Sequence, residues 1–161
     1  MSSTDATVKF VDAALLDTVS ERARAAPRRR MNHNLHRDED AVHRLLNAME
    51  PDSYVVPHRH LDPAKAETIV VLRGLFGLVL FDANGQVERN QVLGDGGPTC
   101  AVELPPGQFH SIVSLVPGSV FFETKAGPYR PLTPEERAAW APNEGEPAAA
   151  AYHAAMRAQF E

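Results

Sequence analysis

Residues 57–67 read PHRHLDPAKAE, with two histidines two positions apart, His58 and His60, and a carboxylate, Glu67, at the end. Side chains at positions i and i+2 of a strand point to the same face, because a strand alternates with a period of two. One strand therefore presents both imidazoles together. The apolar run at 68–72 predicts the next strand, so a short turn can bring Glu67 beside the two histidines.

A second stretch supplies the remaining ligand of this predicted site. Residues 105–110 read PPGQFH, so a Pro-Pro-Gly turn leads directly to His110, which opens the apolar run at 111–116. Three imidazoles and one carboxylate then converge from three strands, and this donor set suits Zn, Fe, Mn, Ni or Co. Four protein ligands leave one or two octahedral positions for water or substrate. The alternative, separate surface or hydrogen-bonded histidines, gives no reason for the spacing.

Short apolar runs separated by turns continue along the chain. The 13 prolines and 10 glycines fall mainly between these runs, and Asn84-Gly85 is a hairpin signal. Many short strands with turns between them indicate a mainly β sandwich or barrel. The predicted strands are residues 54–60, 67–74, 75–82, 86–93, 99–104, 109–116 and 119–125.

Helical patterns appear near both ends of the chain. A helix is predicted over residues 12–26 and a second over residues 38–49, each ended by a proline. Residues 133–136 form a capping box that predicts a short helix running to about Trp140. The alanine-rich residues 148–161 predict a helical but frayed tail. The apolar stripe of the second helix consists of Val42, Leu45, Leu46 and Met49.

Length and charge limit the organisation and the partners. A chain of 161 residues favours one structural domain, which we divide into an N-terminal helical extension (1–50), a barrel (51–130) and a C-terminal helical segment with a tail (131–161). The net charge of −5 argues against nucleic-acid binding, which needs a basic surface.

The compartment is predicted from the chain start and the single cysteine. The first five residues lack the basic region and apolar stretch of a signal peptide, and no apolar run reaches membrane-spanning length. Cys100 is alone, which fits a reducing compartment, and we expect it to be a small buried residue. We therefore expect a cytoplasmic protein without a membrane partner. His43, on the solvent side of the second helix, and His153, in the tail, are expected to be structural.

The two histidine motifs resemble those of the cupin superfamily, which read G-x5-HxH-x(3,4)-E-x6-G and G-x5-PxG-x2-H-x3-N. Residues 58–74 match the first as HxH, six residues, E, six residues and G, and residues 105–110 match the second as PxG-x2-H. The chain departs from the family pattern in the longer spacer before Glu67 and in Ser114, which stands where the second motif has Asn.

Further segments are similar to the WbuC family of cupin-fold metalloproteins. They read SYVxPHxH at 53–60, FExKxGPY at 122–129 and WAPxE at 140–144, and the resemblance covers roughly residues 28–144. It implies a cupin double-stranded β-helix, or jelly-roll barrel, with N-terminal helices and a short C-terminal helix, and also a homodimer. The family is associated with bacterial surface-polysaccharide gene clusters and implies a sugar-like substrate, but no settled reaction.

Other residues are candidates for a pocket around the metal. Glu123 falls on a predicted core strand, where a carboxylate can act as a general base or support a ligating histidine; the alternative is an ion pair with Lys125. Arg30 and His36 are the other candidate catalytic groups, and a solvated basic surface is the alternative for Arg30. The candidate substrate-binding groups are Tyr54, Arg30 and Tyr129.

The sequence therefore predicts a metal-dependent cupin enzyme, an isomerase, a lyase or a dioxygenase. It should bind one divalent transition metal per chain and act on a small oxygen-rich metabolite such as a sugar. Two alternatives stay open: a non-catalytic module that binds or senses a carbohydrate through the metal, and an Fe(II) dioxygenase. Turnover with the native metal would distinguish the enzyme from the module.

Overall fold

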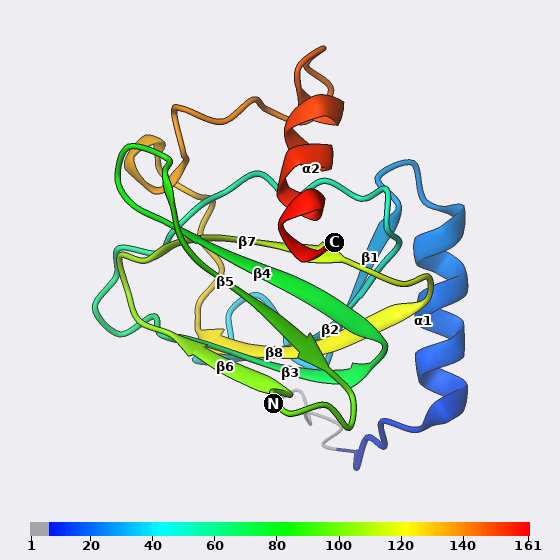
Figure 1. Ribbon diagram of the computed structural model, residues 1–161. Coiled ribbons are helices and arrows are strands. Elements are labelled where there is room, and N and C mark those ends of the chain that lie inside the picture. The colour runs from blue at the N-terminus through cyan, green and yellow to red at the C-terminus, as the bar shows by residue number, and fades with distance from the viewer. Residues whose placement is uncertain (1–6) are drawn as a thin grey trace.

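The computed structural model describes residues 7–161, and the prediction about a signal peptide rests on residues that lie outside this range. Within it, two antiparallel sheets pack face to face (Figure 1), with the strand orders β1-β2-β8-β3-β6 and β5-β4-β7. This confirms the predicted mainly β, jelly-roll fold. The strands are β1 (Arg30–Asn34), β2 (Val42–Met49), β3 (Glu67–Arg73), β4 (Leu75–Phe81), β5 (Val87–Gly94), β6 (Ala101–Leu104), β7 (Phe109–Ser114) and β8 (Ser119–Ala126).

An apolar core lies between the two sheets. Alternate residues of each strand point inward, as the two-residue period requires, so β3 contributes Ile69 and Val71 while β4 contributes Phe76 and Leu78. The Phe76 and Phe121 rings meet edge to face, with centroids 5.1 Å apart. This packing sets the distance between the sheets. The full cluster is Met49, Ile69, Val71, Phe76, Leu78, Leu93, Leu104, Ile112 and Phe121.

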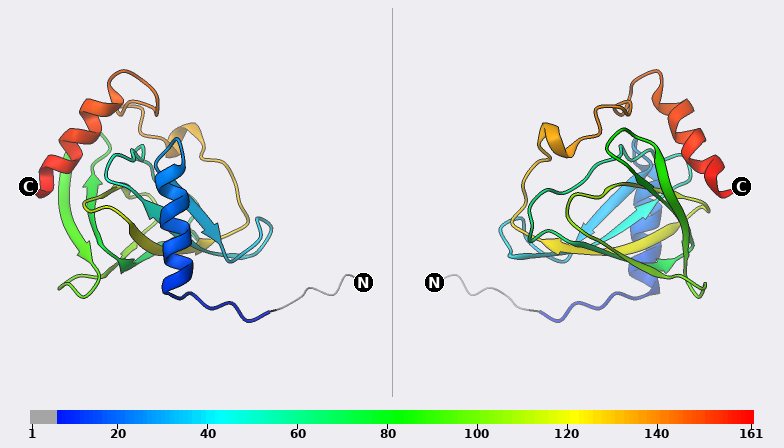
Figure 2. Two further views of the ribbon diagram at one scale, coloured as in Figure 1. Left: turned by 90° about the vertical axis from the view of Figure 1, so that its right-hand side faces the viewer. Right: turned by 60° about the vertical axis from the view of Figure 1, so that its left-hand side comes forward.

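The helix α1 (Ala13–Ala25) covers the outer face of the larger sheet (Figure 2), which confirms the first predicted helix. Asp12 caps its start by accepting a hydrogen bond from the Leu15 N–H at 2.9 Å. Its apolar side packs on outward-facing residues of β2 and β8. The buried contact residues are Val19, Ala23, Leu46, Ala48 and Val120.

The prediction of a second helix is wrong, because residues 42–49 form strand β2, which lies between β1 and β8 in the larger sheet. β2 is buried on both faces, with Leu46 against α1 and Met49 in the core. A strand covered on both sides loses its polar alternation, and its apolar residues then also satisfy a helical stripe. His43 therefore lies on a strand and is buried, not solvent-facing as predicted.

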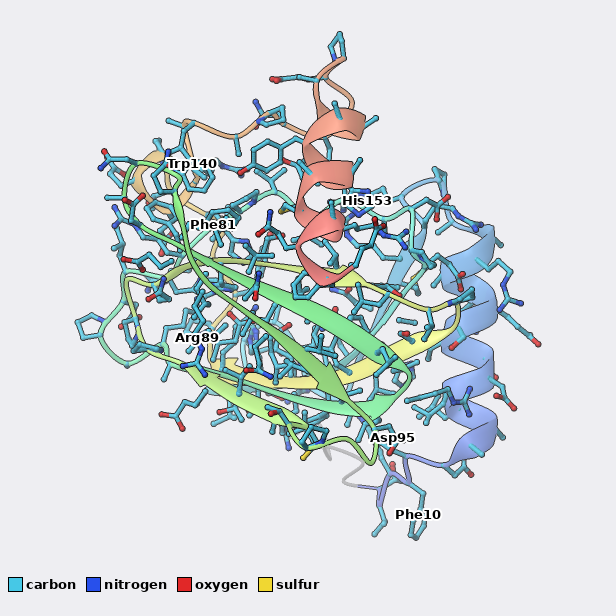
Figure 3. All side chains as sticks on the ribbon, in the orientation of Figure 1. Phe10, Phe81, Arg89, Asp95, Trp140 and His153 are labelled. Atoms are coloured by element: carbon cyan, nitrogen blue, oxygen red, sulfur yellow. The ribbon has the colours of Figure 1, made fainter. Side chains whose placement is uncertain are left out.

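The C-terminal residues form an ordered cover rather than the predicted frayed tail. Helix α2 (Ala149–Arg157) and the 3₁₀ turn η2 (Ala158–Phe160) lie over the smaller sheet. Met156 is buried there, and the ring of Phe160 covers Gly77 of β4. His153, a residue of α2 itself, is also buried on the inner side of that helix (Figure 3). Local sequence signals are weak here, so tertiary packing holds this helix.

The connection before α2 is mostly extended. The predicted capping box forms at η1 (Pro134–Glu136), but the helix stops after one turn and does not run to Trp140. The Glu136 carbonyl instead accepts a hydrogen bond from the Arg59 N–H at 2.9 Å. A hydrogen bond to the segment that contains Arg59 thus replaces a helical hydrogen bond. Trp140 packs against Phe81, with ring centroids 5.0 Å apart (Figure 3).

Three smaller findings complete the fold. The predicted strand over residues 54–60 is extended chain that pairs only at His58, through bridges to His110 and Arg137. Cys100 is exposed and not buried, because it lies in the loop just before the edge strand β6. Among the described residues, no helix is long and apolar enough to cross a membrane.

Candidate metal centre

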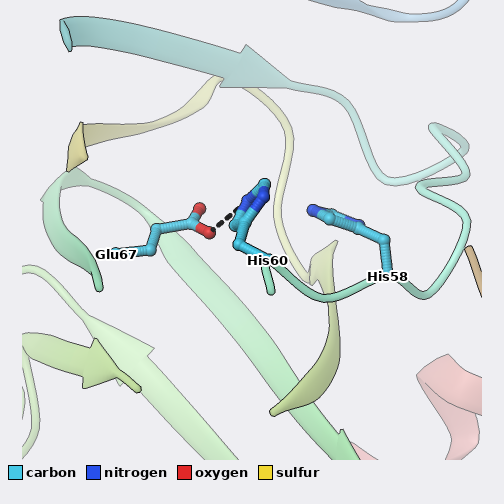
Figure 4. A group of neighbouring side chains, drawn as sticks. All are labelled: His58, His60 and Glu67. Carbon is cyan, nitrogen blue, oxygen red and sulfur yellow. Dashed lines mark ion pairs between the residues drawn. The ribbon is translucent and has the colours of Figure 1, made fainter. Parts of the chain in front are cut away.

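His58, His60 and Glu67 meet on the inner side of the barrel (Figure 4), where one donor atom of each lies within 4.8 Å of the others. The two histidines come from the extended chain before β3, and Glu67 is the first residue of β3. The six-residue spacer forms a loop that returns the chain, so it does not separate the carboxylate from the histidines. Glu67 Oε2 lies 3.2 Å from His60 Nε2.

His110 reaches the same cluster from β7. Its Nε2 lies 3.4 Å from Glu67 Oε2, and its ring centroid lies 4.7 Å from that of His58. The backbones of His58 and His110 exchange two hydrogen bonds, at 3.0 and 2.9 Å. This pairing holds the first histidine motif directly against the second. The structure thus brings together all four residues that the spacing suggested.

Backbone carbonyls orient two of the imidazoles. Nδ1 of His58 lies 3.0 Å from the Val56 carbonyl, and Nδ1 of His110 lies 2.9 Å from the Gln108 carbonyl. A carbonyl can only accept, so each Nδ1 carries the proton and donates. In a neutral ring this leaves the Nε2 lone pair free for a metal.

The buried donor atoms lack satisfactory partners within the protein. Nε2 of His60, Nε2 of His110 and Oε2 of Glu67 are buried, and none makes a well-aligned hydrogen bond. An unsatisfied buried polar atom costs about 1–3 kcal/mol, so three in one place are unusual. A cation bound between them would satisfy all three. The nitrogen and carboxylate donors therefore fit a divalent transition metal.

The electrostatics of the cluster also favour a cation. Burial raises the pKa of Glu67, but the adjacent imidazoles of His110 and His60 outweigh burial and hold that pKa well below its usual value. For His58, burial and the neighbouring His110 lower the pKa, so its ring is neutral at neutral pH. The site therefore presents an ionised carboxylate and a neutral imidazole, both in the protonation state that binds metals.

A cavity of about 240 Å³ opens beside the cluster, with His58, Glu67 and His110 in its wall. Its volume is below the roughly 300–1,000 Å³ typical of sites for drug-sized ligands, so it suits a small metabolite. The part nearest the core is apolar. Polar and charged side chains from three strands or their flanks form much of the remaining wall, namely Arg28, Arg30, Asn32, Asn47, Glu123 and Lys125.

Glu123 lies within this cavity and is held from two sides. Its Oε2 accepts a hydrogen bond from Asn47 Nδ2 at 2.9 Å, and its Oε1 forms a close ion pair with Lys125. Burial and the nearby Glu67 charge raise the pKa of Glu123, while Lys125 acts in the opposite direction. Both sequence interpretations of Glu123, a cavity carboxylate and a partner of Lys125, therefore apply at once.

Comparison with protein families gives one match over just over half of the chain. Residues 11–93, from the start of α1 to β5, match a family described as a domain of unknown function, DUF6016. The chain belongs to the DUF6016 family. The match includes the HxH motif and Glu67 but ends before His110. No curated protein matches the chain.

Solved structures place this DUF6016 protein among cupin folds. KdgF from Halomonas sp. is 18% identical with a TM-score of 0.51, and the alignment covers 65% of this chain and 84% of that one. Oxalate oxidase in complex with glycolate is 13% identical with a TM-score of 0.50, covering 65% and 54%. A cupin superfamily protein from Desulfitobacterium hafniense DCB-2 is 13% identical with a TM-score of 0.48, covering 60% and 76%. The similarity to KdgF and to oxalate oxidase supports the predicted cupin jelly roll as a fold, and the WbuC type stays a prediction.

Three predicted pocket residues lie away from the cavity of this DUF6016 protein. His36 stacks on His43, with ring centroids 3.9 Å apart, in the loop after β1. Tyr54 faces outward and packs beneath α2, where its hydroxyl donates to the Pro142 carbonyl at 2.8 Å. Tyr129 is exposed beyond the end of β8. None of the three lines the cavity, so we withdraw their catalytic and substrate-binding roles.

Sequence reasoning missed other residues of the cavity. Asn32 and Asn47 line it from adjacent positions of β1 and β2. Asn47 was hidden because residues 38–49 were assigned to a helix, whereas on a strand it shares a face with Leu45 and Met49. Glu144, which contacts the cavity residue Arg30 at 2.5 Å, appeared only as the end of the family-like segment WAPxE, and its contact could not be predicted because it belongs to a distant loop.

Proposed function

We propose that this protein is a metal-dependent enzyme acting on a small, oxygen-rich, sugar-like metabolite. The observation that carries the proposal is the convergence of His58, His60, Glu67 and His110 beside a polar cavity, with buried donor atoms left without hydrogen bonds. These four residues would hold one divalent ion. A role in surface-polysaccharide metabolism rests only on the WbuC resemblance.

The chain assigns distinct tasks around that ion. A transition metal held there would supply Lewis-acid polarisation of a ligand oxygen. Glu123 is placed to take or return a proton, since its raised pKa brings it closer to neutral pH than an ordinary carboxyl. Asn47 fixes the direction of the Glu123 carboxylate. Asn32 and Arg30 offer donors to the hydroxyl and carbonyl oxygens of a ligand.

A non-catalytic ligand-binding module is the second candidate, and one contact favours it. Both oxygens of Glu123 are engaged, one by Asn47 and the other by Lys125. A carboxylate held in this way would need to exchange a partner before it could accept a proton from a ligand. If no exchange occurs, Glu123 would serve to shape the cavity and the protein would bind without turnover.

Metal content tests the site directly. The purified protein should carry about one divalent metal per chain, and His58→Ala or His110→Ala should lose it, because each removes a donor with no replacement nearby. Glu67→Gln should retain less than about one tenth of the metal affinity, since the charged oxygen shared by two imidazoles is lost. His33→Ala, a histidine outside the cluster, is the control. Full occupancy by elemental analysis in all four variants would refute the site.

Turnover separates the enzyme from the module. Sugars and sugar acids are screened against protein reconstituted with Fe(II), Mn(II), Ni(II) or Zn(II), and Glu123→Gln is measured beside the native chain. Loss of kcat with little change in binding supports a proton-transfer role. Metal-dependent binding without turnover in any form would support the module instead.

A further inference from the structure

The cavity beside the four candidate metal ligands is called the metal cavity below. A single carboxylate, that of Glu144, bridges two arginines that line it. Glu144 Oε2 lies 2.6 Å from Arg28 Nη2, and its Oε1 lies 2.5 Å from Arg30 Nη1. Arg28 Nε also donates to Oε1, at 3.3 Å. Both arginines line the metal cavity. Paired guanidinium groups holding one carboxylate are the arrangement by which proteins recognise acidic ligands.

Arg30 does not depend on Glu144 for its position. Its side chain is 16% exposed, and Nη1 also donates to the Tyr54 carbonyl at 3.0 Å and to Ser53 Oγ at 3.4 Å. The Glu144 side chain is 33% exposed and belongs to the loop that leads into α2. Arg30 is therefore anchored to the barrel, whereas Glu144 can turn toward solvent. Partly exposed ion pairs are weak, so exchanging Glu144 for another carboxylate costs little.

Glu144 also stands where the cavity adjoins the outside. An open pocket of about 590 Å³ is lined by Arg28, Tyr54, Glu144 and His153, among others. Arg28 lines both this pocket and the metal cavity. A ligand that displaced Glu144 would reach Arg28 and Arg30 from the open pocket, so the Glu144 carboxylate lies between that pocket and the metal cavity.

With a metal bound, the net charge of the cavity would favour an anionic ligand. The cations Arg28, Arg30 and Lys125 are balanced by the carboxylates Glu67, Glu123 and Glu144. A divalent ion then adds two uncompensated positive charges to a partly buried space. A neutral ligand that displaced Glu144 would leave one further positive charge uncompensated, whereas an acidic ligand replaces the charge that Glu144 takes away.

We propose that Arg28 and Arg30 form the carboxylate-binding end of the metal cavity, and that Glu144 occupies this end in the ligand-free protein and gives way to the carboxylate of an acidic, hydroxylated ligand. This inference rests on the proposed metal site and narrows its ligand to an acid. Arg28, Arg30 and Glu67 line the same cavity of about 240 Å³, so one small ligand can contact the arginines and the metal cluster together.

Glu144→Gln tests the displacement, because it keeps the shape of the side chain and removes its charge. Metal-loaded protein is titrated with D-galacturonate and with D-galactose, which differ in the carboxylate. Galacturonate should bind Glu144→Gln roughly three- to tenfold more tightly than the native chain, as expected for releasing one exposed ion pair. Galactose should not distinguish the two proteins. Glu135→Gln, an exposed change of the same charge before α2, should behave as native.

Arg30→Gln removes the residue that would bind the ligand carboxylate, instead of its internal competitor. This variant should therefore lose the preference for galacturonate over galactose. Galacturonate binding that is unchanged, weakened or absent in Glu144→Gln would overturn the inference. Elemental analysis of every variant keeps this outcome separate from failure of the metal site, since that failure appears as full metal occupancy in His58→Ala.

A second measurement needs no sugar and covers the case in which Glu144→Gln folds poorly. Glu144→Ala leaves a gap between the arginines that acetate can fill. Acetate should raise the midpoint of thermal unfolding of metal-loaded Glu144→Ala and leave Arg30→Gln/Glu144→Ala unchanged. Equal effects of acetate on both proteins would overturn the inference.

Discussion

The space between the two sheets has an apolar end and a polar end, and the same strands build both. On β3, Glu67 joins the metal cluster while Ile69 and Val71 join the core. On β8, Phe121 packs in the core and Glu123 lies in the cavity. On both strands, a step of two positions therefore leads from the apolar core to the polar cavity.

The two ends differ in how well their groups are satisfied. Phe76 and Leu93 are fully buried among apolar neighbours. At the polar end, buried atoms of His60, Glu67 and His110 have no hydrogen-bond partner. Folding stability therefore comes mainly from the apolar end, and the polar end keeps binding capacity at a cost in stability. Substitutions at the two ends should have different consequences.

Phe76→Ala should have the largest effect on stability and test this division most severely. Removing the ring leaves a cavity against Phe121 and should lower the free energy of unfolding by about 3–5 kcal/mol, as measured in urea. The folded fraction should still bind metal, because no ligand is touched. Val92→Ala, on the exposed side of β5, should cost less than about 1 kcal/mol. A Phe76→Ala protein that is folded but metal-free would contradict the assignment of stability to the apolar end and metal binding to the polar end.

Gly77→Ala should have a smaller effect and tests the cover outside the smaller sheet. A methyl group on Gly77 would lie 2.3 Å from the Phe160 ring, so the ring must move. The Phe160 ring is only partly buried and can shift outward, so the cost should stay near about 1 kcal/mol, the low end for overpacking. In a Phe160→Ala background the same change should cost nothing. A loss that persists in that background, in urea denaturation, would place the strain within the sheet.

His153 should produce the smallest effect, and its sign contrasts with that of a histidine at the polar end. Burial lowers the pKa of His153, whereas the carboxylate of Glu67 outweighs burial and raises the pKa of His110. Below the unfolded-state pKa of about 6.5, the unfolded chain takes up a proton at His153 that the folded protein resists. The stability due to His153 is therefore complete above that pH and is lost on acidification.

A matched variant isolates this effect. His153→Gln keeps a polar side chain on the inner side of α2 and cannot titrate in this range. The native chain should lose more stability than His153→Gln between pH 7 and 5, measured as the free energy of unfolding of the metal-free proteins. Parallel pH profiles would show that the histidine on the inner side of α2 stays as accessible to protons as in the unfolded chain.

Much of the barrel follows from local patterns. The strands after Glu67 were predicted within a few residues, because turns and alternating apolar residues mark them directly. The first helix was also predicted, since Asp12 and Pro27 mark its limits. β2 was not, because burial on both faces erases the alternation that distinguishes a strand from a helix.

For the candidate site, the sequence determined which residues are available to bind a metal. The spacing of His58 and His60 places them on one side of an extended chain, and the Pro-Pro-Gly turn places His110 at the start of a strand, since both follow from backbone periodicity. Only the tertiary structure decided what surrounds them. Asn47 lines the cavity and Glu144 contacts Arg30 at its edge through pairing of distant segments. His36 and Tyr54 are turned away by packing elsewhere. Such contacts depend on the whole fold, because no local periodicity records them.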